Sequence, residues 1–205
     1  TMERSSTDMS TIAENIANIR ARMNEAAKKA GRDPSEILLC AATKMNDADR
    51  VKEAVFSIIQ FEIGGRRVLD LFAGSGQLGI EALSRGAASA TFVDMSKDSL
   101  SAVKYNLEHT KLGDNAKVVQ TDALSFLKLT KDKFDIVFLD PPYASSLVVD
   151  SMKLLSDVVA AGGCAICETP VDSELPESFG ELKFHRSYRY GKIKITVYRK
   201  EGEDE

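Results

Sequence analysis

The stretch RRVLDLFAGSGQLG, residues 66–79, decides the fold because it joins an apolar, strand-like run ending in Asp70 to a helical pattern through glycines. Gly74, Gly76 and Gly79 match the G-x-G-x-x-G fingerprint of a cofactor-binding loop between a strand and a helix. Three later apolar runs also end in an aspartate, namely Asp94, Asp122 and Asp140. Alternating strand and helix patterns predict an α/β fold, with a mostly parallel sheet covered by helices on both faces.

The pattern of apolar residues also predicts where the elements lie. After the glycine loop we expect helices over 78–84, 97–109, 123–130 and 147–159, with the strands ATFVD, AKVVQTD, FDIVFLD and CAICE among them. Two β-rich stretches, 181–189 and 192–199, meet at Tyr190–Gly191, which predicts a hairpin and an antiparallel last strand.

The N-terminal part has its own pattern. Apolar residues at helical spacing predict a helix from Ile12 to Ala30, the run 37–42 predicts a strand, and a second helix begins at Asp47 or Asp49. We therefore expect a disordered leader (1–9), a helix–strand appendage (10–45), a main domain (46–200) and an acidic tail (201–205).

Composition narrows the class of protein. The 205 residues include 43% hydrophobic and 28% charged residues and carry a net charge of −4, which fits a globular protein and excludes collagen-like chains. No apolar run reaches the roughly 18 residues of a membrane span, so we expect a cytoplasmic protein without a membrane partner. Cys164 and Cys167 lie at odd spacing in one expected strand, which predicts buried thiols on opposite faces and no metal site.

The charge of the first loop favours one cofactor over another. The fingerprint alone fits a nicotinamide dinucleotide or an adenosyl cofactor. Asp70 would repel a pyrophosphate, whereas S-adenosylmethionine has no phosphate and carries an ammonium and a sulfonium. We expect Asp94 to hold ribose hydroxyls and Asp122 to face the adenine amino group. Each aspartate could alternatively be a helix N-cap.

Asp140-Pro141-Pro142-Tyr143 is the most specific motif in the chain. The two prolines fix φ and keep a helix from starting directly after the strand. The Asp140 carboxylate and the Pro141 carbonyl can then accept hydrogen bonds from an exocyclic amino group on a flipped base, and Tyr143 can stack on it. The alternative is a rigid turn with a core tyrosine.

Together these stretches resemble the bacterial RsmD family, which are class I S-adenosylmethionine-dependent 16S rRNA guanine-N2 methyltransferases. The resemblance covers about residues 49–200 and rests on DRVKEAVFSII, VLDLFAGSGQLGIEALSRGA, FDIVFLDPPY and YGKIKITVYRK. It implies a Rossmann-like, seven-stranded sheet with an antiparallel last strand and catalysis at Asp140, Pro141, Pro142 and Tyr143. It also implies a cofactor site made by Asp70, Phe72, Ala73, Gly74, Gly76, Asp94, Met95, Asp122 and Ala123.

The N-terminal segment departs from that family. Met45-Asn46-Asp47-Ala48 stands where the family usually has Arg-Pro-Thr-Thr after a basic β-hairpin. Residues 10–55 instead resemble the start of YggS-type pyridoxal-phosphate-binding proteins, so the chain looks like a chimera. Lys44 falls at that family's Schiff-base lysine, but the barrel's phosphate-binding loops have no counterpart here, and we expect an inert lysine.

The basic segment 181–200 provides the candidate RNA contacts, with seven Lys and Arg residues and one Glu. Arg189, Tyr190 and Lys192 are expected at the cleft, where they would hold phosphates and stack on bases. The alternative is a solvated sheet edge that uses charge against aggregation.

We therefore expect a monomeric methyltransferase that needs no metal and modifies a nucleobase amino group, with guanine N2 of 16S rRNA as the best candidate. Its partner would be ribosomal RNA or the assembling small subunit. Two alternatives stay open: methylation of adenine N6 or glutamine N5, and a chimera that binds cofactor but lacks the hairpin that grips RNA.

Overall fold

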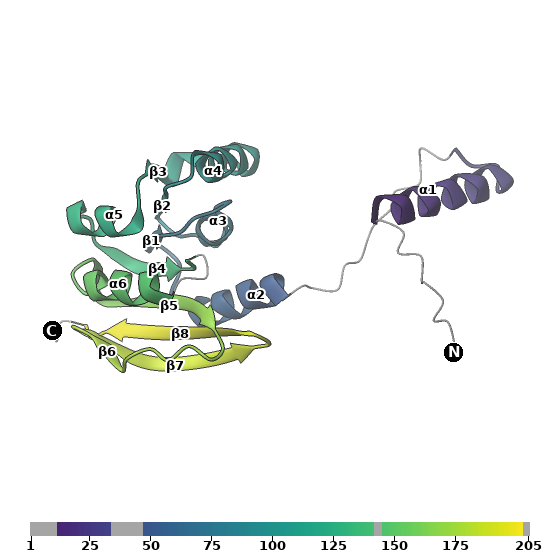
Figure 1. Cartoon of the computed structure of the whole chain (residues 1–205). Helices are drawn as coiled ribbons and strands as arrows, with labels where there is room; N and C mark the ends of the chain where they lie inside the picture. Colours follow the sequence, from purple (N-terminus) through teal and green to yellow (C-terminus); the bar gives the residue numbers. More distant parts are fainter. Residues whose placement is uncertain (1–11, 34–46, 142–144, 203–205) are drawn as a thin grey trace, which may run out of the picture. The chain divides into compact units, whose positions relative to one another are not determined.

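The computed structural model describes residues 12–33, 47–141 and 145–202 (Figure 1). The chain divides into two compact units, residues 1–44 and 45–205. The first contains α1 (Ile12–Lys29), close to the helix expected from Ile12 to Ala30. The expected leader 1–9, the expected strand 37–42 and Lys44 lie outside the described residues.

The second unit is an α/β fold, as expected, built on one sheet (Figure 1). Its strands are β1 (Arg67–Asp70), β2 (Ser89–Asp94), β3 (Ala116–Gln120), β4 (Phe134–Leu139), β5 (Val159–Pro170), β6 (Ser178–Phe179), β7 (Leu182–Tyr190) and β8 (Ile193–Lys200). Its helices are α2 (Asp47–Ile59), α3 (Gln77–Ser84), α4 (Lys97–Thr110), the 3₁₀ helix η2 (Gly113–Asn115), α5 (Ala123–Leu129) and α6 (Ser145–Leu155).

The strand order is β3-β2-β1-β4-β5-β8-β7-β6, with the first five strands parallel. The last long strand, β8, is antiparallel to β5 and to β7, which confirms the expected hairpin. The sheet has eight strands in the described part of the chain, one more than expected, because the short β6 pairs with the start of β7. Because β8 is antiparallel to both β5 and β7, β7 runs in the same direction as the parallel strands.

Strand alternation divides the core into two layers, one on each face of the sheet. In β4, Ile136 and Phe138 face the layer under α2, α3 and α4, while Val137 and Leu139 face the layer under α5 and α6. In β5, Cys164 and Cys167 belong to opposite layers and are buried as free thiols, as predicted. The helices lie on both faces because the strands are apolar on both sides (Figure 1).

Two element boundaries differ from the expectation. Strand β5 begins at Val159 rather than at Cys164, because the chain passes through an irregularity where the pairing with β4 shifts between Phe134 and Ile136. Gly162, with φ of 72°, lies in this irregularity, where its freedom to adopt a positive φ is needed. Helix α6 therefore ends at Leu155, earlier than the expected residue 159.

Within the described ranges, none of the helices is long and apolar enough to cross a membrane.

Candidate active site

The carboxyl ends of the parallel strands bring three of the four predicted aspartates together on one face of the sheet. Asp70 in β1 pairs with Phe92 of β2 and with Phe138 of β4. Asp94 and Asp140 each lie two residues further along these neighbouring strands, so their side chains share the face that α3 and α4 cover. The sheet therefore gathers these aspartates at the edge where open α/β sheets bind ligands.

Asp70 is the buried anchor of this edge. Its side chain is only 3% exposed, and its Oδ2 accepts a hydrogen bond from the Gly79 backbone N–H at 2.9 Å. The pKa of Asp70 is raised to about 7, mainly by burial and also by the negative charges of Asp140 and Asp94, against the lowering effect of the Gly79 N–H. A cation bound here would favour the ionised form of Asp70.

The glycine loop takes a shape that needs its glycines. Gly74 and Gly76 have φ of 52° and 80°, in the left-handed region, and Gly76 is the N-cap of α3. A Cβ on Gly74 would meet nothing within 4 Å, so the loop leaves open space above it. From α4, the Asn106 side chain donates to the Ser75 carbonyl at 3.0 Å and holds the loop in place.

Asp94 ties the second strand to the same loop. Its two carboxylate oxygens accept backbone N–H groups, Oδ2 from Gly74 at 2.9 Å and Oδ1 from Ser96 at 2.8 Å. Each oxygen keeps a further lone pair for a ligand hydroxyl. Next to it, Met95 is 74% exposed and offers an apolar surface. Phe72 is half-buried against the core layer under α5 and α6, whereas Ala73 is buried in the opposite layer.

Asp122 is a helix N-cap, which was the alternative interpretation of each strand-end aspartate. It is the N-cap of α5 and accepts the Ser125 N–H at 2.9 Å, with the buried Ala123 as the first helical residue. Hydrogen bonds from the Ser125 side chain and backbone hold the pKa of Asp122 below its usual value. Its carboxylate is exposed, and a contact with an adenine amino group stays a prediction.

The predicted base-binding motif begins directly after β4. The Asp140 side chain is accessible at the rim of the edge, yet the surrounding protein removes enough water to raise its pKa. Pro141 is half-buried beside it. Pro142 and Tyr143 lie outside the described residues, so the stacking role of Tyr143 stays a prediction.

Glu168 is a further candidate site residue, which the sequence analysis did not identify. It lies in β5 next to Cys167, which pairs with Leu139, so Glu168 stands beside Asp140 on the neighbouring strand. It is half-buried; burial and the charge of Asp140 raise its pKa to about 7. The sequence carries a signal for it, because the predicted strand CAICE also ends in an acid, a glutamate where the other strands end in aspartate.

The predicted RNA-contact residues reach the same edge of the sheet. Tyr190 pairs with Ile193, and Ile193 pairs with Pro170 at the end of β5. Tyr190 is half-buried, whereas Arg189 and Lys192 are exposed. The hairpin thus presents cations at the edge that carries Asp140, as expected, and RNA contact stays a prediction.

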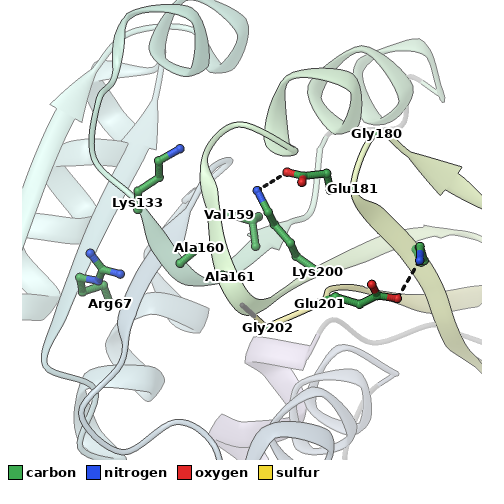
Figure 2. Close-up of a pocket in the computed structure, with 11 residues that line it drawn as sticks. Arg67, Lys133, Val159, Ala160, Ala161, Gly180, Glu181, Lys200, Glu201 and Gly202 are labelled. Atoms are coloured by element: carbon green, nitrogen blue, oxygen red, sulfur yellow. Dashed lines mark hydrogen bonds and ion pairs between the residues drawn. The ribbon is translucent and has the colours of Figure 1, made fainter. Parts of the chain in front are cut away.

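A cavity of about 730 Å³ lies elsewhere, at the amino ends of the strands (Figure 2). Its cations are mostly paired: Lys200 with Glu181 at 2.7 Å, and Lys183 with Glu201 at 2.7 Å. None of the predicted site residues lines it. Because the ligand site of an open α/β sheet lies at the opposite edge, we assign this cavity no catalytic role.

Across 12–33, 47–141 and 145–202, no group of three or more His, Cys, Asp or Glu side chains is arranged to hold a metal ion.

Comparisons with known proteins agree with this architecture. A family model described as Conserved hypothetical protein 95 matches residues 36–199. Ribosomal RNA small subunit methyltransferase D of Escherichia coli K12 is 36% identical over 159 residues, which cover 77% of this chain and 80% of that protein. A conserved hypothetical protein of Streptococcus pyogenes has a solved structure that matches with a TM-score of 0.70 at 34% identity, covering 75% of this chain and 98% of that chain.

A more distant structure shares the fold. The 16S rRNA N2 methyltransferase RsmC of T. thermophilus, solved with AdoMet and guanosine, matches with a TM-score of 0.65 and 22% identity. The match covers 79% of this chain and 45% of that one. At this identity the likeness concerns the fold alone.

Proposed function

Because the chain belongs to the family described as Conserved hypothetical protein 95, we propose that it methylates the N2 amino nitrogen of a guanine in small-subunit ribosomal RNA, with S-adenosylmethionine as methyl donor. The relative from Escherichia coli is named as a small-subunit rRNA methyltransferase and matches most of both chains. That name does not say which atom of the RNA is methylated, so guanine N2 is part of our proposal.

One observation carries the proposal: buried and half-buried carboxylates surround an open glycine loop. Asp70 has a raised pKa because it is buried among like charges, and Asp140 has a raised pKa because the protein around it displaces part of its water. Such a cluster is unfavourable without a cation, and S-adenosylmethionine brings an ammonium and a sulfonium. The open space at Gly74 leaves room for it. A dinucleotide would place its pyrophosphate beside Asp70, which is unfavourable.

Each residue of the proposed site has a role that follows from its position. Asp70 and the loop at Gly74 would hold the cationic part of the cofactor, and Asp94 its ribose hydroxyls. The cofactor supplies a methyl group on a positively charged sulfur. The Asp140 carboxylate and the Pro141 carbonyl would accept hydrogen bonds from the two amino N–H groups, which orients the nitrogen lone pair toward the methyl donor. After transfer, Asp140 would accept the proton released from nitrogen.

Asp140→Ala separates cofactor binding from transfer. We expect calorimetric affinity for S-adenosylmethionine to stay within about 3-fold of the wild-type value, since Asp70 and Asp94 are retained, while transfer falls by about 100-fold or more. Transfer is measured as tritium from labelled cofactor in immature small ribosomal subunits.

Asp157→Ala is the matched control, because Asp157 is exposed just before β5, at the opposite edge of the sheet. It should leave both the affinity for S-adenosylmethionine and the rate of methyl transfer unchanged. No binding heat with S-adenosylmethionine would refute the cofactor assignment. Full transfer by Asp140→Ala would refute the role of Asp140, and label in DNA or protein alone would refute rRNA as the substrate.

A further inference from the structure

We propose that Glu168 determines the base specificity of this site by accepting the N1–H of the target guanine, next to the amino group held by Asp140. The inference rests on the proposed function and deepens it, because it names the atom by which guanine is told from adenine. Glu168 would contact the substrate base through its carboxylate.

The register of the sheet places Glu168 where such a contact is possible. Leu139 of β4 pairs with Cys167 of β5, so the next residues along the two parallel strands, Asp140 and Glu168, are neighbours. Both alternate onto the face of Ile136 and Cys164, the same face as Asp70. On the other side of Glu168, its partner in β8 is Ile195, an apolar residue. The carboxylate therefore stands between Asp140 and the hairpin.

The Glu168 carboxylate has no partner in the part of the chain that the structure describes: no hydrogen bond or ion pair joins it to another residue there. Glu62 is a half-buried carboxylate that does have a cationic partner. It accepts hydrogen bonds from the two terminal guanidinium nitrogens of Arg199, at 2.7 and 2.9 Å, and its pKa is lowered. A half-buried acid without such a cation costs stability, which is the pattern expected of a group reserved for a ligand.

The chemistry of the base edge makes the contact selective. Guanine presents two adjacent donors, the N2 amino group and N1–H, whereas N1 of adenine is an acceptor. An ionised carboxylate only accepts hydrogen bonds. Glu168 therefore attracts guanine and repels adenine at the same position. Since its pKa is raised to about 7, the acceptor form dominates in mildly alkaline buffer.

The test compares guanine with 2-aminopurine, which keeps the amino group but has an acceptor at N1. Small subunits are assembled with either base at the guanine that the wild-type protein methylates, and transfer is measured at pH 8.5. We expect the wild type to prefer guanine by about 10- to 100-fold, as for a lost hydrogen bond to a charged group. Glu168→Gln can donate to the N1 acceptor, so its preference should fall by about 10-fold or more.

Glu177→Gln is the matched control, because Glu177 is exposed just before β6, which pairs with the amino-terminal start of β7. Its preference should equal that of the wild type. Thermal unfolding of Glu168→Gln checks the fold, and the wild-type comparison needs no variant at all.

The outcomes separate this inference from the proposed function. Wild-type transfer to guanine without discrimination against 2-aminopurine overturns the role of Glu168 and leaves the proposed function standing. A folded Glu168→Gln that keeps the full wild-type preference overturns it as well. No transfer by the wild type to guanine in any ribosomal RNA overturns both.

Discussion

Asp70 is the residue on which the carboxyl edge of the sheet depends. It combines two roles that conflict energetically, because it fixes the start of α3 through the Gly79 N–H while lying in a place that disfavours its charge. Its pKa is raised to about 7, mainly by burial. A cation bound at this point, as proposed above, would offset the unfavourable burial of this acid.

This raised pKa predicts how stability depends on pH. Between the pKa of an unfolded aspartate and about 7, the folded state holds a proton on Asp70 that the unfolded state has lost, so stability falls as pH rises. Asp70→Asn removes that proton equilibrium and can still accept the Gly79 N–H. We expect its free energy of unfolding, relative to the wild type, to grow by about 2–3 kcal/mol from pH 5 to pH 8.

Urea unfolding at both pH values measures the effect, with Asp172→Asn as the control because that carboxyl is exposed. A difference between Asp70→Asn and the wild type that stays constant with pH would contradict the raised pKa. The control should show such a constant difference.

At the scale of elements, the contact between α3 and β2 sets the position of the glycine loop. A Cβ on Gly79 would lie 2.3 Å from the ring of Phe92, a side chain that is fully buried in β2. The helix can therefore approach the sheet only where it has no side chain. The same close approach allows the Gly79 N–H to donate a hydrogen bond to Asp70, so the packing of α3 on β2 also determines the geometry of the candidate site.

Gly79→Ala should consequently force the helix away from the sheet. We expect the free energy of unfolding to fall by about 1–3 kcal/mol, as in other overpacked cores, and affinity for S-adenosylmethionine to weaken. Gly64→Ala is the matched control, since a Cβ there would meet nothing within 4 Å. Chemical denaturation and calorimetry measure the two effects. Equal stability of the two variants would show that Phe92 can move aside without cost.

At the scale of the whole molecule, the main feature is that the hydrophobic core lies in the second unit. Both layers of the core, from Val51 to Tyr198, belong to the second unit. The half-buried ion pair between Glu62, just after α2, and Arg199 in β8 closes that unit across 137 residues of sequence. The resemblance of residues 10–55 to another family stays a prediction, because residues 34–46 lie outside the described ranges.

We expect residues 45–205 to fold without residues 1–44, since the second unit contains both core layers. Its thermal midpoint should lie within about 3 °C of that of the full chain, which is about the shift that 1 kcal/mol produces in a domain of this size. Calorimetric scans of both chains measure this, and methyl transfer by the shorter chain tests whether the appendage contributes to activity. A loss of the cooperative transition would show that the N-terminal unit is part of the fold.

Local sequence patterns predicted most elements of the second unit and the gathering of Asp70, Asp94 and Asp140, because strand period, glycines and strand-end acids are encoded within a few residues of each other. The start of β5 and the extra strand β6 were not predictable in this way. The start of β5 depends on pairing with Phe134 of β4, which is distant in the sequence. Strand β6 has only two residues, Ser178 and Phe179, so it is too short to show an alternating pattern, although its partners Leu182 and Lys183 are close in the sequence.

The sequence by itself determined the α/β alternation, and it led to the predictions that the glycine loop favours a cation and that the motif after β4 binds an amine. Only the tertiary structure decided that Glu168 stands beside Asp140 and that Asp122 is occupied as a helix cap. The reason is physical: which strands become neighbours, and how much water each carboxylate keeps, is fixed by the packing of distant segments and not by any local run of residues.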